Sequence, residues 1–411
     1  MKILVLNAGS SSQKSRLYEL KDELPDLPVA PLWEADADSS ERPGVTRLKI
    51  TTAQGQTLEE ELQTDSRQDV ITHLLDTLWS GKTQVLVHPS EIDIVGHRVV
   101  HGGQEFRKST SITPAVKDAI KRLSAYAPLH NPINLEGIEA VERILPHVPQ
   151  VAVFDTAFHS QLPMAALVYP GPYEWFEEGI RRYGFHGISH QYCAGRAAQI
   201  LGRDLASLRL ITCHIGNGCS LAAISGGHSI DTTMGFTPLE GLMMGSRSGT
   251  VDPGILIYLV RQKGYSADQL DTLLNKESGL KGISGVSSDM REVLSAIREG
   301  NERARLAFDM YIHRLRSSIG AMLATLGGVD AFVFAGGVGE HASSVRWAAC
   351  KAFGFLGLKL DAAKNAQSPA DQDIATADSA VRVLIVQTQE DWSIAKECWR
   401  IASSKPPGQS G

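Results

Sequence analysis

The amino-acid sequence predicts an α/β protein built from two related domains. Short runs of β-forming residues alternate with helical periodicities along the chain, a pattern typical of α/β folds. A strand, a small polar turn and a second strand occur near residues 3–20 and again near residues 210–224, which indicates a duplication. The length of 411 residues also exceeds that of one domain of about 150 residues.

The predicted strands share a β-rich composition and end in glycine or polar clusters. They cover residues 3–6, 92–95, 151–154, 208–212, 331–334 and 381–386. Apolar residues at i, i+3, i+4 and i+7 predict helices between several of these strands. The helices are expected around residues 71–78, 135–145 and 302–326, the last as one long helix.

Three polar segments interrupt this alternation. Residues 22–69 contain prolines and many charges and alternate around Leu48 and Ile50, so we expect exposed hairpins there rather than a linker. Residues 361–378 form a low-complexity polar stretch that predicts a loop. Residues 403–411 predict a disordered tail.

Composition and charge narrow the class of protein. Hydrophobic residues make up 43% and charged residues 21%, an ordinary globular composition that excludes a collagen-like, coiled-coil or disordered chain. With 40 basic and 46 acidic side chains the net charge is −6, so the footprint of a nucleic-acid binder is absent. The five cysteines form no C-x-x-C pair and predict reduced thiols. Without a signal-peptide core or a long apolar stretch, we expect a cytoplasmic protein that contacts no membrane.

Three clusters of small residues lie at residues 9–12, 216–220 and 336–340, with Lys14 beside the first. Such clusters let backbone N–H groups converge on an anion, so together they indicate a phosphate or nucleotide ligand. Residues 337–342 also match the dinucleotide-binding pattern, which makes a nicotinamide-dependent oxidoreductase an alternative. That motif lies near the end of the chain, with little room for the rest of a doubly wound sheet.

Two arginines and one aspartate lie in contexts that favour ligand binding. Arg98 and Arg247 lie in glycine-rich segments, and a guanidinium offers a planar fork to a carboxylate or a phosphate. Asp155 follows a predicted strand, at the carboxyl end where open α/β sheets bind ligands. An aspartate at this place can equally cap a turn or a helix.

Two histidines and one glutamate complete the candidates from the residues themselves. His186 and His190 are four residues apart, a spacing that could bind zinc on one helix face, although no third ligand is evident. A histidine that donates to developing negative charge is the favoured interpretation. Glu390 follows the strand predicted at 381–386 and could complete a magnesium shell by way of water.

Taken together, eight segments in order resemble the acetate kinase family over almost the whole chain. They are LNAGSSS at 6–12, GHRVVHGG at 96–103, PLHNP at 128–132, FDTAFH at 154–159, YGFHGISH at 183–190, HIGNG at 214–218, residues 231–249, and FAGGVGE at 334–340. The sequence departs from the usual pattern of that family at Ser15, Thr250, His341, Gln389 and Asp391.

The resemblance implies the actin-like ATPase fold, with two duplicated ribonuclease H-like domains around a nucleotide cleft. The first domain would comprise residues 1–155 and a returning helix at 391–403, the second, nucleotide-binding domain residues 156–390, and the tail residues 404–411. It implies ATP (or ADP in reverse) as co-substrate, Mg²⁺ with Mn²⁺ as an alternative, acetate as substrate, and a homodimer. It further implies a role in acetate metabolism and acetyl-CoA biosynthesis.

The resemblance also implies roles for individual residues. Asp155 would be the catalytic acid/base or an orienting carboxylate, and His186 and Arg247 would stabilise the transferring phosphoryl group. The substrate would contact Arg98, Val100, Leu129, His130, Phe185 and Pro238. The nucleotide would contact Lys14, His214, Ile215, Gly216, Asn217, Gly218, Asp289, Met290, Arg291, Gly337, Val338, Gly339, Glu340 and His341. The metal would be held by Asn7 and Glu390.

Two alternatives share this fold. A propionate kinase differs by one methylene in the substrate, and an apolar pocket discriminates such a group by only ~1–3 kcal/mol. A non-metabolic ATPase, such as a chaperone or filament protein, would not need Arg98, Asp155, His186 and Arg247 together.

Overall fold

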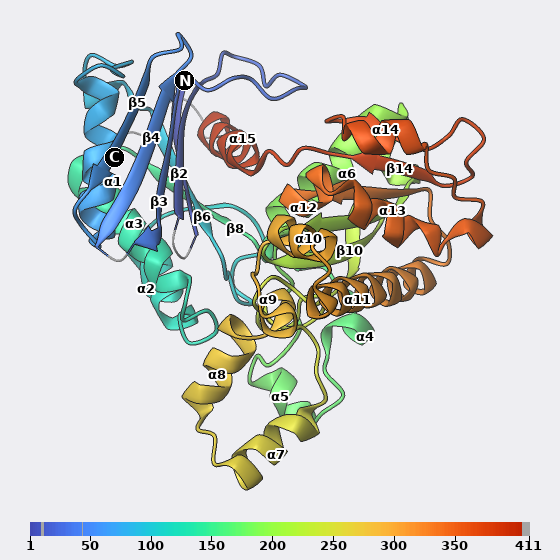
Figure 1. Ribbon diagram of the computed structural model, residues 1–411. Helices are drawn as coiled ribbons and strands as arrows, with labels where there is room; N and C mark the ends of the chain where they lie inside the picture. The colour runs from blue at the N-terminus through green and yellow to red at the C-terminus, as the bar shows by residue number, and fades with distance from the viewer. Residues whose placement is uncertain (10–11, 43, 405–411) are drawn as a thin grey trace. The chain divides into compact units, whose positions relative to one another are not determined.

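The computed structural model describes residues 1–9, 12–42 and 44–404 (Figure 1). The chain divides into two compact units. Unit 1 comprises residues 1–157 and the segment from Gln389 onward, and unit 2 comprises residues 158–388. Among the described residues, every helix is too short or too polar to cross a membrane.

Unit 1 contains an eight-stranded mixed sheet with the order β5-β4-β3-β2-β1-β6-β8-β7. β1, β6 and β8 run parallel to one another, and all other neighbours are antiparallel. β8 is buried along its length, as a central parallel strand requires, whereas β4 alternates between buried and exposed positions. The strands are β1 (Lys2–Ala8), β2 (Ser12–Glu19), β3 (Trp33–Arg42), β4 (Val45–Thr52), β5 (Thr57–Leu62), β6 (Ile94–Val99), β7 (Thr110–Ser111) and β8 (Gln150–Phe154).

Four α-helices among the described residues accompany this sheet. They are α1 (Arg67–Trp79), α2 (Pro114–Leu123), α3 (Asn131–Ile144) and α15 (Glu390–Ser403). The apolar stripe predicted for 71–78 is buried on α1, and α1 packs against α3. α15 packs against β1 and β6, where Gly96 leaves it room. A Cβ on Gly96 would lie 2.5 Å from Cys398 Sγ and 2.6 Å from Ile394 Cγ2.

Unit 2 repeats the central part of this arrangement. Its six-stranded sheet has the order β11-β10-β9-β12-β14-β13. β9, β12 and β14 are parallel, and β10, β11 and β13 pair antiparallel with their neighbours. The series β3-β2-β1-β6-β8-β7 of unit 1 therefore recurs with the same strand directions, which confirms the predicted duplication. The strands are β9 (Arg209–Ile215), β10 (Cys219–Ser225), β11 (His228–Thr232), β12 (Ala331–Ala335), β13 (Gln372–Asp373) and β14 (Arg382–Ile385).

The helices of unit 2 include the long one predicted at 302–326. α11 spans these residues, contacts α9, α10 and β10, and buries an apolar stripe that includes Phe308, Leu315 and Ile319. The helices are α4 (Met164–Leu167), α5 (Tyr173–Glu177), α6 (Gly187–Leu201), α7 (Pro253–Lys263), α8 (Ala267–Lys276), α9 (Gly279–Ser284), α10 (Met290–Arg298), α11 (Glu302–Leu326), α12 (Gly336–His341), α13 (Ser343–Lys351) and α14 (Ala362–Gln367).

Two of the three polar segments differ in part from the expectation. The hairpins at 22–69 exist as β3, β4 and β5, but they are not wholly exposed, because Trp33 and Ile50 are buried in a core shared with α1. The loop predicted at 361–378 contains α14 and β13. Ser403 still belongs to α15, and residues 405–411 of the predicted tail lie outside the described residues.

Candidate active site

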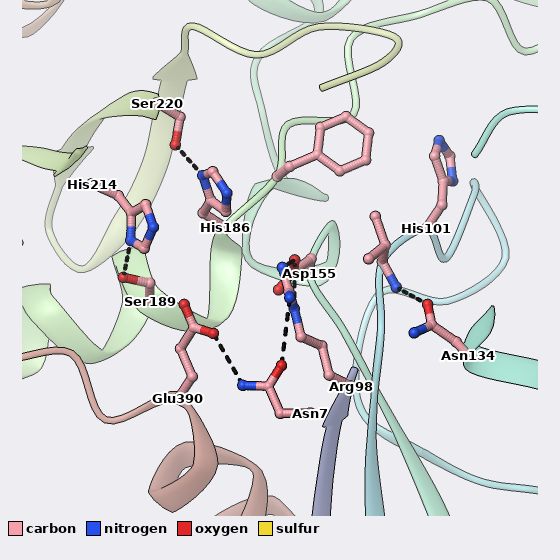
Figure 2. A network of polar contacts seen from close by, with 12 residues as sticks. Asn7, Arg98, His101, Asn134, Asp155, His186, Ser189, His214, Ser220 and Glu390 are labelled. Atoms are coloured by element: carbon pink, nitrogen blue, oxygen red, sulfur yellow. Dashed lines mark hydrogen bonds and ion pairs between the residues drawn. The ribbon is translucent and has the colours of Figure 1, made fainter. Parts of the chain in front are cut away.

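In unit 1, the carboxyl ends of two parallel strands bring Arg98 and Asp155 together (Figure 2). Arg98 lies on β6 and Asp155 directly follows its neighbour β8. The Arg98 Nε and Nη2 atoms donate to Asp155 Oδ2 at 3.0 and 2.5 Å. Arg98 Nη1 also donates to Asn7 Oδ1, at 3.4 Å. The strand ends thus hold an arginine in fixed orientation at the edge where α/β sheets bind ligands.

The carboxylate of this ion pair is buried, and the guanidinium is largely buried. Asp155 is 1% exposed. Burial raises the pKa of Asp155, and the Arg98 guanidinium opposes that shift. Burial alone would lower the pKa of Arg98, but the carboxylates of Asp155, Glu390 and Asp391 raise it instead. Arg98 therefore stays charged, and Asp155 acts first as its counter-ion.

The first turn of α15 contributes two carboxylates beside Asn7. Asn7 Nδ2 donates to Glu390 Oε2 at 3.3 Å and to Asp391 Oδ1 at 2.8 Å (Figure 2 shows the contact with Glu390). Burial raises the pKa of Asp391, and the nearby Arg16 opposes the rise. Glu390, which we expected in the second domain, opens α15 and so belongs to unit 1.

The start of α3 holds the segment that follows Arg98. Asn134 Oδ1 accepts the Val100 N–H at 3.1 Å, and Asn131 Oδ1 accepts the His101 N–H at 3.1 Å. His130 is the N-cap residue of α3. Sequence reasoning missed both asparagines, because their partners are backbone groups about 30 residues away.

In unit 2, His186 has an unusual backbone conformation, and its ring contacts His214 and Ser220. It is the N-cap residue of α6, with a left-handed φ of 57° that few non-glycine residues adopt. Its ring stacks on that of His214, with centroids 4.2 Å apart, and its Nδ1 lies 2.9 Å from Ser220 Oγ (Figure 2). The preceding Phe185 is buried.

His186 and Arg247 meet beside Gly218. A Cβ on Gly218 would lie 3.5 Å from Cε1 and 3.6 Å from Nε2 of His186, and 3.6 Å from Nη1 of Arg247. The glycine thus leaves open a space that both side chains border. Two of the three expected catalytic residues therefore lie together in unit 2, and the third, Asp155, lies with Arg98 in unit 1.

Arg247 has no acidic partner among the described residues. Its Nη1 donates to the Pro238 carbonyl at 3.0 Å. Burial lowers the pKa of Arg247, but a guanidinium stays charged at any physiological pH. A partly buried cation without a counter-ion in its own unit indicates an anionic ligand.

The hairpin between β9 and β10 is held closely to the loop that carries Arg247. Gly245 N donates to Asn217 O at 3.0 Å, and a Cβ on Gly245 would lie 2.0 Å from Asn217 Oδ1. Gly216 N donates to Gly218 O at 3.1 Å and closes the turn. The same Cβ on Gly245 would lie 2.9 Å from the backbone oxygen of Ser288, so a side chain at 245 is disfavoured, which explains part of the glycine-rich sequence around Arg247.

The third glycine cluster forms α12. Its Glu340 folds back, and Oε1 accepts the N–H groups of Gly336 at 3.0 Å and Thr388 at 3.2 Å. The fully buried Arg346 donates to the carbonyls of Gly339 and Glu340 at 2.7 and 2.8 Å and so fixes the end of α12. Sequence reasoning missed Arg346, since nothing near it marks it as buried.

The remaining expected residues lie on separate elements. Asp289 caps α10 and bonds to the exposed Arg291. Lys14 is exposed on β2 and pairs in register with Asn7. Leu129 is exposed before α3. Of the first glycine cluster, residues 10 and 11 lie outside the described residues.

His186 and His190 do not form a zinc site. Their nearest ring nitrogens both lie beside Ser220 Oγ, at 2.9 and 2.7 Å. Across the described residues, no group of three or more His, Cys, Asp or Glu side chains is arranged to hold a metal ion. The spacing of four residues instead places the two rings on either side of one hydroxyl.

The repeated sheet with its polar strand ends defines an α/β protein of the actin-like ATPase fold. The chain belongs to the Acetokinase family, whose model matches residues 2–396. It is 65% identical over 402 residues to the acetate kinase of Nostoc punctiforme, covering 98% of this chain and 99% of that protein. The acetate kinase of Gloeobacter violaceus is also 65% identical over 402 residues, covering 97% of this chain and 99% of the relative.

Solved structures support the same fold. The chain resembles the crystal structure of Porphyromonas gingivalis acetate kinase with a TM-score of 0.88 and 42% identity, covering 98% and 99% of the two chains. A propionate kinase from Francisella tularensis also gives a TM-score of 0.88, at 38% identity and with 97% and 99% covered. Family membership argues against the oxidoreductase alternative, whose motif forms α12 after β12.

Proposed function

We propose that this protein catalyses the reversible transfer of the γ-phosphoryl group of ATP to acetate, giving acetyl phosphate and ADP. The observation that carries the proposal is the convergence of His186 and Arg247 on the open space beside Gly218. Two donors that border one space suit the equatorial oxygens of a transferring phosphoryl group. Relatives named acetate kinase, at 60–65% identity, favour acetate over propionate as the acceptor, since the propionate kinase is only 38% identical.

Arg98 would hold the carboxylate of the acceptor. A guanidinium has five N–H donors, and the contacts of Arg98 with Asp155 and Asn7 engage three of them. Two donors thus remain for a carboxylate, enough for a bidentate pair. Val100, buried two residues after Arg98, offers the apolar surface for a methyl group, with Leu129 and His130 before α3. In unit 2, we propose that Phe185 and Pro238 provide apolar surface for the same methyl group.

The transfer itself needs little acid–base chemistry. A carboxylate oxygen of acetate attacks the γ-phosphorus in line, and the bond from that phosphorus to the β,γ-bridging oxygen breaks as ADP leaves. Acetate is already ionised at neutral pH, so no proton has to be removed. His186 and Arg247 would stabilise the charge on the transferring group, while Asp155 keeps Arg98 oriented.

A divalent metal is expected for this reaction, and the residues at the start of α15 fit one. Glu390 and Asp391 supply carboxylate oxygens, which Mg²⁺ prefers, and Mg²⁺ commonly adds only one or two carboxylates to the substrate phosphates. Asn7 turns its Nδ2 toward both carboxylates and its Oδ1 toward Arg98, so its amide would have to rotate to offer an oxygen to the metal. Bound Mg²⁺, or Mn²⁺ in its place, would neutralise charge on the phosphates. Glu390 and Asn7 are the residues we propose as its ligands.

The nucleotide would contact four segments. Two of them are glycine-rich segments that directly follow strands: residues 214–218 at the end of β9, and α12 after β12. Backbone N–H groups of such segments commonly bind phosphate. The start of α10, residues 289–291, and Lys14 on β2 complete the proposed nucleotide contacts.

A homodimer in the cytoplasm completes the proposal. α7 has no buried residue, and Ile255, Ile257, Tyr258 and Val260 are each about half exposed. An apolar helix so exposed favours burial against a second copy of the chain. All five cysteines are buried free thiols, which suits a reducing compartment. Light scattering on the purified protein should give twice the chain mass, and Ile257→Asp should halve it. A monomeric wild type would refute the dimer.

The activity is tested by trapping acyl phosphate with hydroxylamine, using ATP, Mg²⁺ and formate, acetate, propionate or butyrate. We expect the highest kcat/KM with acetate and a decline as the chain lengthens. An optimum at propionate would keep the mechanism and change the substrate. ATP hydrolysis without any acyl phosphate would instead indicate a non-metabolic ATPase and would overturn the proposal.

A further inference from the structure

A chain of buried hydrogen bonds runs from β9 to His186. Thr212 Oγ1 on β9 lies 2.7 Å from His190 Nδ1, and His190 Nε2 lies 2.7 Å from Ser220 Oγ. Ser220 Oγ lies 2.9 Å from His186 Nδ1, a contact drawn in Figure 2. Thr212 and His190 are 1% exposed and Ser220 is 0% exposed, so the first two of these bonds are shielded from solvent, whereas the bond to His186 is partly buried.

The buried hydroxyl of Thr212 fixes the direction of the first bond. Among the described residues, its only hydrogen-bond acceptor is His190 Nδ1. A buried hydroxyl that left its proton without an acceptor would lose a full hydrogen bond, so Thr212 donates to that nitrogen. Burial, with His159 and His214 nearby, holds the pKa of His190 well below 6.5 and keeps the ring neutral. His190 therefore carries its single ring proton on Nε2.

The tautomer of His190 sets the donor and acceptor in each of the next two hydrogen bonds, up to His186. His190 Nε2–H donates to Ser220 Oγ, which uses one lone pair of the hydroxyl. The proton of Ser220 is left for His186 Nδ1. A neutral imidazole that accepts at Nδ1 carries its proton on Nε2. That Nε2 atom borders the space beside Gly218, which Arg247 Nη1 also borders.

We propose that Thr212, His190 and Ser220 are positioning residues that hold His186 as the neutral tautomer with its proton on Nε2, ready to donate to the transferring phosphoryl group. The inference rests on the proposed phosphoryl transfer. Stacking on His214 fixes the plane of the His186 ring, and the Ser220 bond fixes its rotation within that plane. No proton is transferred along the chain during the reaction: its role is to make Nε2 a donor before the substrate arrives.

The tautomer is measured directly by ¹⁵N NMR on protein labelled at its 13 histidines. The His186 signals are assigned by their loss in His186→Asn. We expect an unprotonated Nδ1 and a protonated Nε2 on His186, and the same pattern on His190. A protonated Nδ1 on wild-type His186 would overturn the proposal. This reading needs no turnover, so it is separate from the test of the proposed function.

The kinetic test uses two substitutions at one position. Thr212→Val keeps the shape and removes the hydroxyl, and it should lower kcat about 10- to 100-fold while KM for ATP and acetate changes about twofold or less. Thr212→Ser restores the donor and should restore kcat. Ser379→Ala deletes another buried hydroxyl of unit 2 and is the matched control, with kcat expected unchanged.

Each outcome separates the two proposals. An inactive wild type would refute the phosphoryl transfer and leave the tautomer to NMR. An active wild type with unchanged kcat in Thr212→Val would refute the positioning role. If Thr212→Val fails to fold, Ser220→Ala should show the same loss of kcat, with the proton of His186 redistributed between its two nitrogens.

Discussion

The open space beside Gly218 predicts that a single methyl group there abolishes most of the activity. Gly218→Ala would place a carbon 3.6 Å from His186 Nε2 and 3.6 Å from Arg247 Nη1, which is ordinary van der Waals contact. Gly218 is not among the glycines with positive φ, so alanine can adopt its backbone conformation. We therefore expect the free energy of unfolding to change by about 1 kcal/mol or less.

The loss of activity follows from the distances that the reaction needs. A phosphoryl oxygen has to come within about 2.7–2.9 Å of these nitrogens, whereas it can approach a methyl carbon only to about 3.3 Å. The methyl group therefore blocks the part of the space between the two donors from which one oxygen could reach both of them. Loss of one such donor typically costs about 10²- to 10³-fold in kcat, and we expect a loss of that size in Gly218→Ala.

The assay is acyl phosphate formation from ATP and acetate, with thermal denaturation on the same samples. Gly195→Ala is the matched control, because Gly195 lies in α6, the helix that His186 caps, and a Cβ there meets no atom within 4 Å. It should keep the wild-type kcat. A wild-type kcat in Gly218→Ala would refute the placement of the phosphoryl group beside His186 and Arg247.

Four further predictions concern the two groups of polar residues and the fold. Arg247→Lys should lower kcat at least tenfold, because an ammonium cannot offer a planar fork, and unchanged kcat would contradict its role. Asp155→Asn keeps an oxygen that accepts from Arg98, so kcat/KM should fall only about tenfold; a fall beyond about 10³-fold would indicate proton transfer by Asp155. Gly96→Ala should destabilise unit 1 by about 1–3 kcal/mol through overlap with α15, measured by urea denaturation, and an unchanged midpoint would contradict that packing. Burial lowers the pKa of His97 and of His159 to about 4, below the ordinary value of 6.5, so stability is fully present above about pH 6.5 and declines toward pH 4. Urea midpoints that stay level between pH 7 and pH 5 would disprove this.

The strands predicted from the sequence are the ones that define the duplication. The six runs overlap β1, β6 and β8 in unit 1 and β9, β12 and β14 in unit 2, which are the parallel strands of each sheet. Such strands are buried on both faces and read as continuous apolar runs, so composition alone reveals them. The strands at the edges of the sheets lack such continuous apolar runs, so this criterion did not predict them.

The segment at 22–69 shows why strands outside the parallel core are harder to predict in full. Alternation around Leu48 and Ile50 predicts a hairpin correctly, but the helix that covers its inner face is α1, which follows only after residue 66. Local sequence carries the period of a strand and not the identity of its partner. Similarly, the polar composition of 361–378 hides α14, whose N-cap Asp361 accepts the Lys364 N–H at 3.0 Å.

The candidate site was predicted in part. The resemblance named His186 and Arg247, and the glycine-rich contexts marked Arg98 and Arg247 as ligand-binding. Their arrangement depends on contacts between distant segments: Gly218 between two side chains, and Ser220 between His186 and His190. A spacing of four residues drew attention to the two histidines, but only the fold shows that a serine from β10 lies between them.

The most direct test of the central claim is a ³¹P NMR record of ATP, acetate and Mg²⁺ with the purified protein. We predict that the γ-phosphate signal of ATP declines while signals of acetyl phosphate and ADP grow in equal amounts, and that added acetyl phosphate and ADP reverse the change. Growth of inorganic phosphate in place of acetyl phosphate, with hydroxylamine trapping nothing, would contradict the account.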